Sequence, residues 1–213
     1  MRHPLVTTAL IATLGSAALV STQALADYGK GDFYTRVGVA KVKPDSDNGS
    51  LMGGTMDTDV HDDNGFAFTL GYRFHDKFGV ELLAAEPFEH DVDLNVGGND
   101  IGASVEHLPP TLTVQYYPFG GTASRVQPYA GIGVNYTHFS DEDIDLQGAD
   151  LDLKESWGWA GQAGLDLLID DHWAANMAVW YLDIDSDVDL NGEDIGEIEV
   201  DPYVIMAGIS YRF

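Results

Sequence analysis

In the central parts of the alternating apolar segments of this 213-residue chain, charged side chains occupy only one face. In the segment 64–74, for example, Arg73 shares its face with Thr69, whereas Phe68 and Leu70 lie on the opposite face. Successive side chains of a β-strand point to opposite sides of the sheet, so this second face is apolar over the length that crosses a membrane. A soluble sheet would carry polar residues on its exposed face. The pattern therefore predicts transmembrane strands whose charges face the axis of a barrel.

Eight segments show this alternation and are rich in aromatic and β-branched residues. Tight turns and long acidic stretches connect them in alternation, which is typical of a barrel with short periplasmic turns and long extracellular loops. We therefore predict an all-β fold, an eight-stranded antiparallel transmembrane β-barrel in the outer membrane of a Gram-negative bacterium, with both termini periplasmic. The expected strands are 32–42, 64–74, 77–88, 105–117, 125–139, 156–169, 172–184 and 197–213. The expected long loops are 43–63, 89–104, 140–155 and 185–196.

The beginning of the chain has the features of a secretory signal peptide. Arg2 precedes an apolar run, and small residues lead up to Ala26. We expect a signal peptide over 1–26 and the barrel over 27–213. Removal of the peptide leaves 9 of the 10 basic residues and all 35 acidic ones. This charge argues against nucleic acid as a partner, and the lack of cysteine excludes disulfides and thiolate metal sites. No cofactor is expected.

The inward positions divide the predicted lumen into two layers. Toward the turns they carry charges that must pair, because an unpaired buried charge is costly. We expect a polar plug formed by Arg36, Arg73, Glu81, Asp166 and Arg212. Farther out the inward positions are apolar, and we expect them to bind an alkyl chain or ring, with Trp180 and Leu83 lining or gating the pocket. The predicted ligand-binding residues are Leu83, Ala85, Trp180, Leu182, Val204 and Met206. The alternative is that these side chains only pack the interior, since eight strands enclose little more than side chains or one small ligand.

Three prolines fall on two neighbouring predicted strands. Pro87 lies on the third strand, and Pro109 and Pro110 lie on the fourth. Proline donates no hydrogen bond to a ladder, and a closed barrel has no edge at which to place it. The prolines therefore predict a weakened lateral seam, through which a hydrophobic solute would pass from the lumen into the bilayer. The alternative is a β-bulge without a role in transport.

The acidic stretches contain an internal repeat. Residues 91–95 read D-V-D-L-N, residues 187–191 repeat this, and residues 143–147 are a variant of it. Alternating Asp and aliphatic residues predict strands that continue beyond the membrane, with Gly-Gly and Asn-Gly turns at their tips. Carboxylates also fit Ca²⁺ or Mg²⁺, which would bridge these stretches to lipopolysaccharide, although the spacing does not match an EF-hand loop. The alternative is a solvated surface suited to saline surroundings.

One set of residues has the composition of a hydrolytic site. His138, Ser140 and Glu142 alternate and so project from one face of a strand. Such a set could activate a serine for acyl transfer. Side chains two residues apart on a strand are separated by about 7 Å, which is too far for a hydrogen-bonded relay. The chain is not expected to be an enzyme.

Several motifs together resemble the OmpW family of small outer-membrane barrels, over nearly the whole of residues 27–213. They are G-V-E-L-L-A-A at 79–85, H-L-P-P-T-L at 107–112, N-Y-T at 135–137, S-W-G at 156–158 and W-Y-L-D-I-D at 180–185. The resemblance implies an eight-stranded barrel associated with the passage of small hydrophobic molecules. The acidic stretches depart from the family pattern, which affects specificity carried by the loops. The final Y-R-F at 211–213 is similar to the signal recognised by the barrel assembly machinery.

Two functions of different kinds follow from these observations. The first is an outer-membrane channel or binder that passes small hydrophobic molecules through an apolar upper lumen and out sideways into the bilayer. The second is a solid-cored structural or surface-interaction barrel that acts through its acidic extracellular loops. The expected partners are outer-membrane lipid and lipopolysaccharide, small hydrophobic solutes and the barrel assembly machinery.

Overall fold

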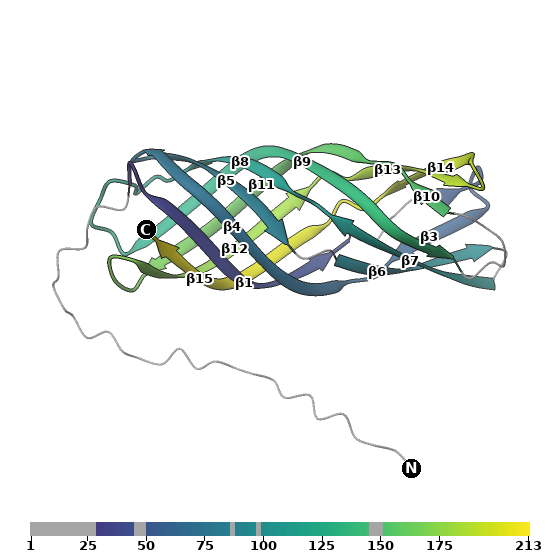
Figure 1. The fold of residues 1–213 in the computed structure, drawn as a ribbon, viewed down its shortest axis with the longest axis horizontal. Coiled ribbons are helices and arrows are strands. Elements are labelled where there is room, and N and C mark those ends of the chain that lie inside the picture. The colour runs from purple at the N-terminus through teal and green to yellow at the C-terminus, as the bar shows by residue number, and fades with distance from the viewer. Residues whose placement is uncertain (1–28, 45–49, 86–87, 97–98, 145–150) are drawn as a thin grey trace, which may run out of the picture.

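Eight antiparallel strands close into a long barrel in the computed structural model, which describes residues 29–44, 50–85, 88–96, 99–144 and 151–213 (Figure 1). The predicted signal peptide lies outside the described residues and stays a prediction. The sheet closes because the first barrel strand pairs with the last, β1 with β15. The barrel strands are β1 (Phe33–Lys43), β4 (Asp63–His75), β5 (Phe78–Ala85), β8 (Thr111–Tyr116), β9 (Val126–Ile144), β11 (Ser156–Leu168), β12 (Trp173–Leu182) and β15 (Tyr203–Arg212). The predicted eight-stranded barrel is confirmed.

The remaining strands prolong the barrel at the end opposite the C-terminus, where Figure 1 shows β3, β10, β13 and β14. They are β2 (Ser50–Leu51), β3 (Met56–Val60), β6 (Phe88–Val96), β7 (Asn99–Leu108), β10 (Leu151–Leu153), β13 (Asp185–Leu190) and β14 (Glu193–Glu199). We call this set the outer extension. The first four belong to the barrel sheet through the pairing of β7 with β9, whereas β10, β13 and β14 form a separate three-stranded sheet. The acidic stretches expected as loops are therefore largely strand, as the Asp–aliphatic repeat predicts.

Two predicted strand boundaries are wrong for the same reason. The expected strand 105–117 is divided, because β7 ends at Leu108 and β8 begins only after Pro109 and Pro110. The expected strand 197–213 begins instead at Tyr203, since residues 197–199 belong to β14 in the separate sheet. In both places a proline precedes the barrel strand and interrupts the ladder.

The predicted faces of the strands are confirmed. Arg73 and Glu81 are buried at 0% and 1% exposure, whereas Phe68, Leu82 and Ile209 are 40–50% exposed on the outer surface. Burial alternates residue by residue along β4 and β12, as a period of two requires. The described residues contain no helix long and apolar enough to span a membrane.

An aspartate fastens the separate sheet to the barrel. Asp201, at the junction of β14 and β15, accepts hydrogen bonds from the Tyr181 hydroxyl at 2.7 Å and from the backbone N–H of Ile184 at 3.0 Å. Its backbone φ is 38°, in the left-handed region. The Asn191–Gly192 turn at the other end of β13 also has positive φ at both residues, as the predicted Asn-Gly turn requires.

Like charges face each other along this hairpin. Asp185 pairs in register with Glu199, and Asp187 with Glu197, which places carboxylates directly opposite one another. Lys154 lies 3.7 Å from Asp187 and 3.3 Å from Asp189, farther along the same strand. Desolvation, followed by the charges of Asp201, Asp183, Glu197 and Glu199, raises the pKa of Asp185 from 3.8 to about 6.

This pKa predicts that acid strengthens the β13–β14 hairpin. Because Asp185 takes up a proton more readily in the folded hairpin than in the unfolded chain, its contribution to stability is fully present below about pH 4 and is lost as the pH rises through about 6. Hydrogen exchange, corrected for the intrinsic pH dependence, should show stronger protection of β13 and β14 at pH 5 than at pH 7. Asp185→Asn should give the stronger protection already at pH 7. A pH response that is equal in β12 and β15 would contradict this assignment.

Candidate functional site

Arg36 lies at the centre of a buried polar cluster toward the turn end of the barrel. Its guanidinium forms an ion pair with Glu81 and a two-pronged contact with Asp166, in which the Nη2–Oδ2 and Nε–Oδ1 distances are 2.6 and 3.2 Å. All three side chains are inaccessible to solvent. Neutral donors complete the cluster: Gln115 and Gln162 donate to Glu81 at 2.8 and 2.7 Å. Asn176 donates to Asp166 at 2.7 Å. We call this cluster the plug.

Two tyrosine rings enclose the guanidinium of Arg36. Its carbon lies 4.4 Å from the centre of the Tyr34 ring and 4.3 Å from that of Tyr129, within range of a cation–π contact. The rings lie across the inner wall where Gly71 and Gly164 leave space, since a Cβ at either glycine would collide with the ring. These contacts fix the cation between its carboxylates and exclude water from it.

The other two arginines of the predicted plug are placed differently from the expectation. Arg73 stacks on Tyr117, 3.5 Å from the ring centre, and donates to the backbone carbonyl of Asp76 in the turn. Arg212 donates to the carbonyl of Asp171 and lies 3.3 Å from Asp32 at the turn end. The plug proper is thus Arg36 with Glu81 and Asp166. The other two cations fasten turns, because their strand positions place them closer to the end of the barrel.

The predicted upper lumen is apolar and filled by its own side chains. Trp180, Leu182 and Met206 are fully buried, and Leu83 and Val204 are 3% and 2% exposed. All five belong to one continuous apolar cluster. Ala85 lies on β5, but its side chain is outside the described part of the structure. The structure therefore brings five of the six predicted lining residues together in one packed apolar cluster.

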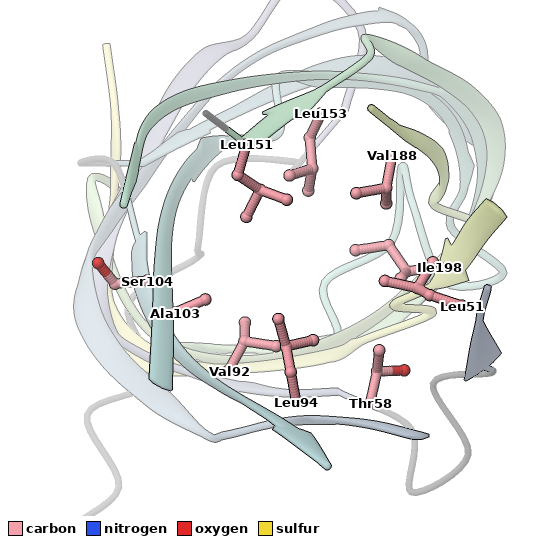
Figure 2. A pocket seen from close by; sticks show the side chains of 10 residues that line it. All are labelled: Leu51, Thr58, Val92, Leu94, Ala103, Ser104, Leu151, Leu153, Val188 and Ile198. Carbon is pink, nitrogen blue, oxygen red and sulfur yellow. The ribbon is translucent and has the colours of Figure 1, made fainter. Parts of the chain in front are cut away.

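An apolar cavity of about 30 Å³ lies farther out, inside the outer extension. Figure 2 shows the aliphatic side chains around it pointing toward a common centre. Its lining comes from both sheets of the extension: Leu51, Thr58, Val92, Leu94, Ala103, Ser104, Leu151, Leu153, Val188 and Ile198. We call this space the vestibule. The sequence analysis did not predict these residues as a site, although the aliphatic positions of the Asp–aliphatic repeat were the available signal.

The ladder between the third and fourth barrel strands is interrupted near the prolines. Pairing of β5 with β8 ends at Leu83 and Thr111, and pairing resumes between Phe88 of β6 and His107 of β7. No pairing across this line joins the described residues in between. Pro109 and Pro110 lie in this interval, whereas Pro87 is outside the described residues. On its other side the interval stays attached to β9, because Tyr136 donates to the carbonyl of Pro110 at 3.1 Å.

The possible hydrolytic set lies on the outer surface. Phe139 is buried, so its neighbours His138 and Ser140 face away from the lumen, and the His138 imidazole is 3.6 Å from Glu155. Both partners of that contact are 57% exposed. The side chain of Glu142 is outside the described part of the structure.

The predicted divalent cations stay a prediction. Within the part of the chain that the structure describes, no group of three or more histidine or acidic side chains is arranged to hold a metal ion. Several acidic side chains of the repeats lie beyond that part, including those of residues 141–150.

Comparison with known proteins places the chain among outer-membrane barrels. The model of the OmpW family matches residues 29–213. Outer membrane protein W of Escherichia coli (strain K12) is 41% identical over 211 residues, covering 95% of this chain and 98% of that protein. The crystal structure of outer membrane protein OprG from Pseudomonas aeruginosa superposes with a TM-score of 0.81 at 41% identity, over 88% of this chain and 98% of OprG.

A third relative was solved in a bilayer. The structure of outer membrane protein AlkL in DMPC lipid bilayers has a TM-score of 0.68 at 26% identity and covers 93% of this chain and 97% of AlkL. The predicted location, the outer membrane of a Gram-negative bacterium, is confirmed by these relatives. The eight-stranded barrel with its apolar outer face and these matches lead to one conclusion: the chain belongs to the OmpW family.

Proposed function

We propose that this barrel passes small hydrophobic molecules from outside the cell into the outer membrane. The observation that carries the proposal is the continuous apolar cluster that runs from the vestibule residues Leu94 and Val188 to Trp180, directly beyond the plug. Lumens of transmembrane barrels are usually polar. Here the apolar interior begins in the outer extension, which is surrounded by water. A hydrophobic solute could therefore pass the charged outer surface through this interior.

The vestibule must widen to admit a solute. A cavity of about 30 Å³ has room for about one water molecule. Its walls belong to two sheets, which the bond from Met52 N–H to the Ile195 carbonyl at 2.7 Å links at one edge. Displacement of the separate sheet would open the vestibule while the barrel ladder stays intact.

The plug supports a sideways exit. Straight passage toward the periplasm would require separating Arg36 from Glu81 and Asp166 in a site without water, which leaves buried charges unpaired. The interrupted ladder near Pro109 and Pro110 offers another way out. Unpaired backbone in hydrocarbon is costly, so a short interval of this kind fits a seam covered by side chains.

The packed lumen favours one alternative, a solid-cored barrel that acts through its outer surface. Trp180, Leu182 and Met206 have no exposed area. In that case the vestibule would be the core of a rigid extension. The carboxylates on its outer face, such as Asp187, would then carry the function.

A charge in the vestibule separates the two functions. Val188→Asp places a carboxylate in the apolar wall, and the initial rate of octane transfer into proteoliposomes should fall by at least about tenfold, since burial of an unpaired charge costs more than 1.4 kcal/mol. Asp187→Asn is the matched control, because Asp187 is the exposed neighbour on the same strand. Transfer that equals that of protein-free liposomes, for the unmodified chain as well, would establish the solid-cored barrel.

Restoring backbone donors at the seam tests the exit. The double substitution Pro109→Ala, Pro110→Ala returns two N–H groups to the interval and should slow release of octane into the bilayer, while binding in detergent is retained. Pro128→Ala in β9, which is paired with Leu165 of β11 and lies outside the interrupted interval, serves as the control. Equal release rates for both variants and the unmodified chain would exclude this route.

Removing the central cation should destabilise the barrel. Arg36→Met leaves Glu81 and Asp166 buried without their partner, and the free energy of unfolding in lipid vesicles should fall by about 3–5 kcal/mol. Urea titration followed by tryptophan fluorescence measures this. The triple variant Arg36→Met, Glu81→Gln, Asp166→Asn should recover most of the loss, because it removes the unpaired charges as well. Unchanged stability of the single variant would show that the plug is not paired as described.

A further inference from the structure

Trp180 carries a buried hydrogen-bond donor that no described residue uses. Its side chain is fully buried, and its indole N–H has no acceptor. Trp157, Trp159 and Trp173 instead face outward and are 42–73% exposed. A buried tryptophan N–H usually finds a partner, and an unpaired donor in an interior calls for an unseen one.

The donor lies at the boundary between the polar and apolar layers of the lumen. Trp180 is directly opposite Gln162 on one side and Val204 on the other. The Gln162 oxygen is already engaged, because it accepts from Thr113 at 3.0 Å and from Gln115 at 2.8 Å. Beyond Trp180 the lumen continues with buried aliphatic side chains such as Leu182 and Ile184. A molecule at this level therefore meets one free donor below and hydrocarbon above.

We propose that the preferred solute is a neutral single-chain amphiphile with one hydrogen-bond acceptor, a ketone, ester or alcohol, which accepts the Trp180 indole N–H while its alkyl tail inserts among the aliphatic side chains of the upper lumen and displaces them. This rests on the proposed passage of hydrophobic molecules and narrows their class. The plug disfavours an anionic head group, because the Gln162 amide next to Trp180 donates at 2.7 Å to the Glu81 carboxylate, and the indole N–H offers no acceptor to a cationic one. An anionic head group at Trp180 would be separated from the Glu81 carboxylate only by Gln162, and the two like charges would repel each other.

The test compares a ketone with an alkane of the same number of non-hydrogen atoms. Transfer of 2-decanone and undecane into proteoliposomes is measured for the unmodified chain and for Trp180→Phe, which keeps an aromatic ring but removes the N–H. The ratio of ketone to alkane transfer should fall by about tenfold, which corresponds to the loss of one hydrogen bond. Trp157→Phe, which changes an outward indole, should leave the ratio unchanged.

Three other outcomes would contradict the inference or the proposed function. An unchanged ratio in Trp180→Phe, with both solutes still transferred, overturns the inference and assigns the donor to a bound water. An equal fall for both solutes also overturns it, since Trp180 then acts only through packing. Absence of transfer of either solute by the unmodified chain contradicts the proposed function itself.

A spectroscopic measurement keeps the inference testable if Trp180→Phe folds poorly. In the unmodified chain with ¹⁵N-labelled tryptophan, the indole N–H resonance of Trp180, assigned by its absence in the variant or by selective labelling, should shift downfield on addition of 2-decanone. It should not shift on addition of undecane. Equal shifts for the two solutes would overturn the inference.

Discussion

The structure of the barrel depends on where charged side chains can be placed, because one face of every barrel strand contacts hydrocarbon. The axis is the only place left, and eight strands enclose an axis so narrow that side chains from distant strands meet there. Arg36 from β1, Glu81 from β5 and Asp166 from β11 meet in this way. Their pairing places one cation between two carboxylates and ties three parts of the wall to one centre. The charged side chains can therefore pair only when the sheet closes into a barrel.

Inward and outward side chains also alternate along the strands of the outer extension, but there the outward side chains face water and not lipid. Along β12 the outward residues, such as Met177, are apolar because they face lipid. Along β13 the outward residues, such as Asp187, are acidic because they face water. The inward residues from Trp180 to Val188 are apolar on both strands except for Ser186. One continuous interior thus passes from the membrane into the aqueous extension although the exterior changes completely.

The sequence predicts well which face of a strand a residue occupies, because this depends on a few neighbouring residues. It predicts poorly which residues contact each other, because contacts depend on strands that are far apart in the sequence. Whether Phe68 or Arg73 faces outward follows from a period of two within a few residues. Which strand supplies the partner of Arg73 depends on the stagger of the closed sheet, which no local pattern contains. For this reason the carboxylate partners of Arg36 lie where expected, while Arg73 and Arg212 fasten turns instead. The unpaired N–H of Trp180 is likewise visible only when all of its neighbours are placed.

The separate sheet has a consequence for how such chains can vary in length. Because β10, β13 and β14 share no ladder with the barrel sheet, the hairpin that ends at Asn191–Gly192 can grow or shrink without shifting any barrel pairing. In a regular ladder residues are added in twos on each arm, which keeps Val188 inward and its acidic neighbours outward, and a single extra residue requires a β-bulge such as the register shift next to Val188. The length of the outer extension can therefore change in steps of one Asp–aliphatic pair. This pair is the unit that the repeats at 91–95 and 187–191 display.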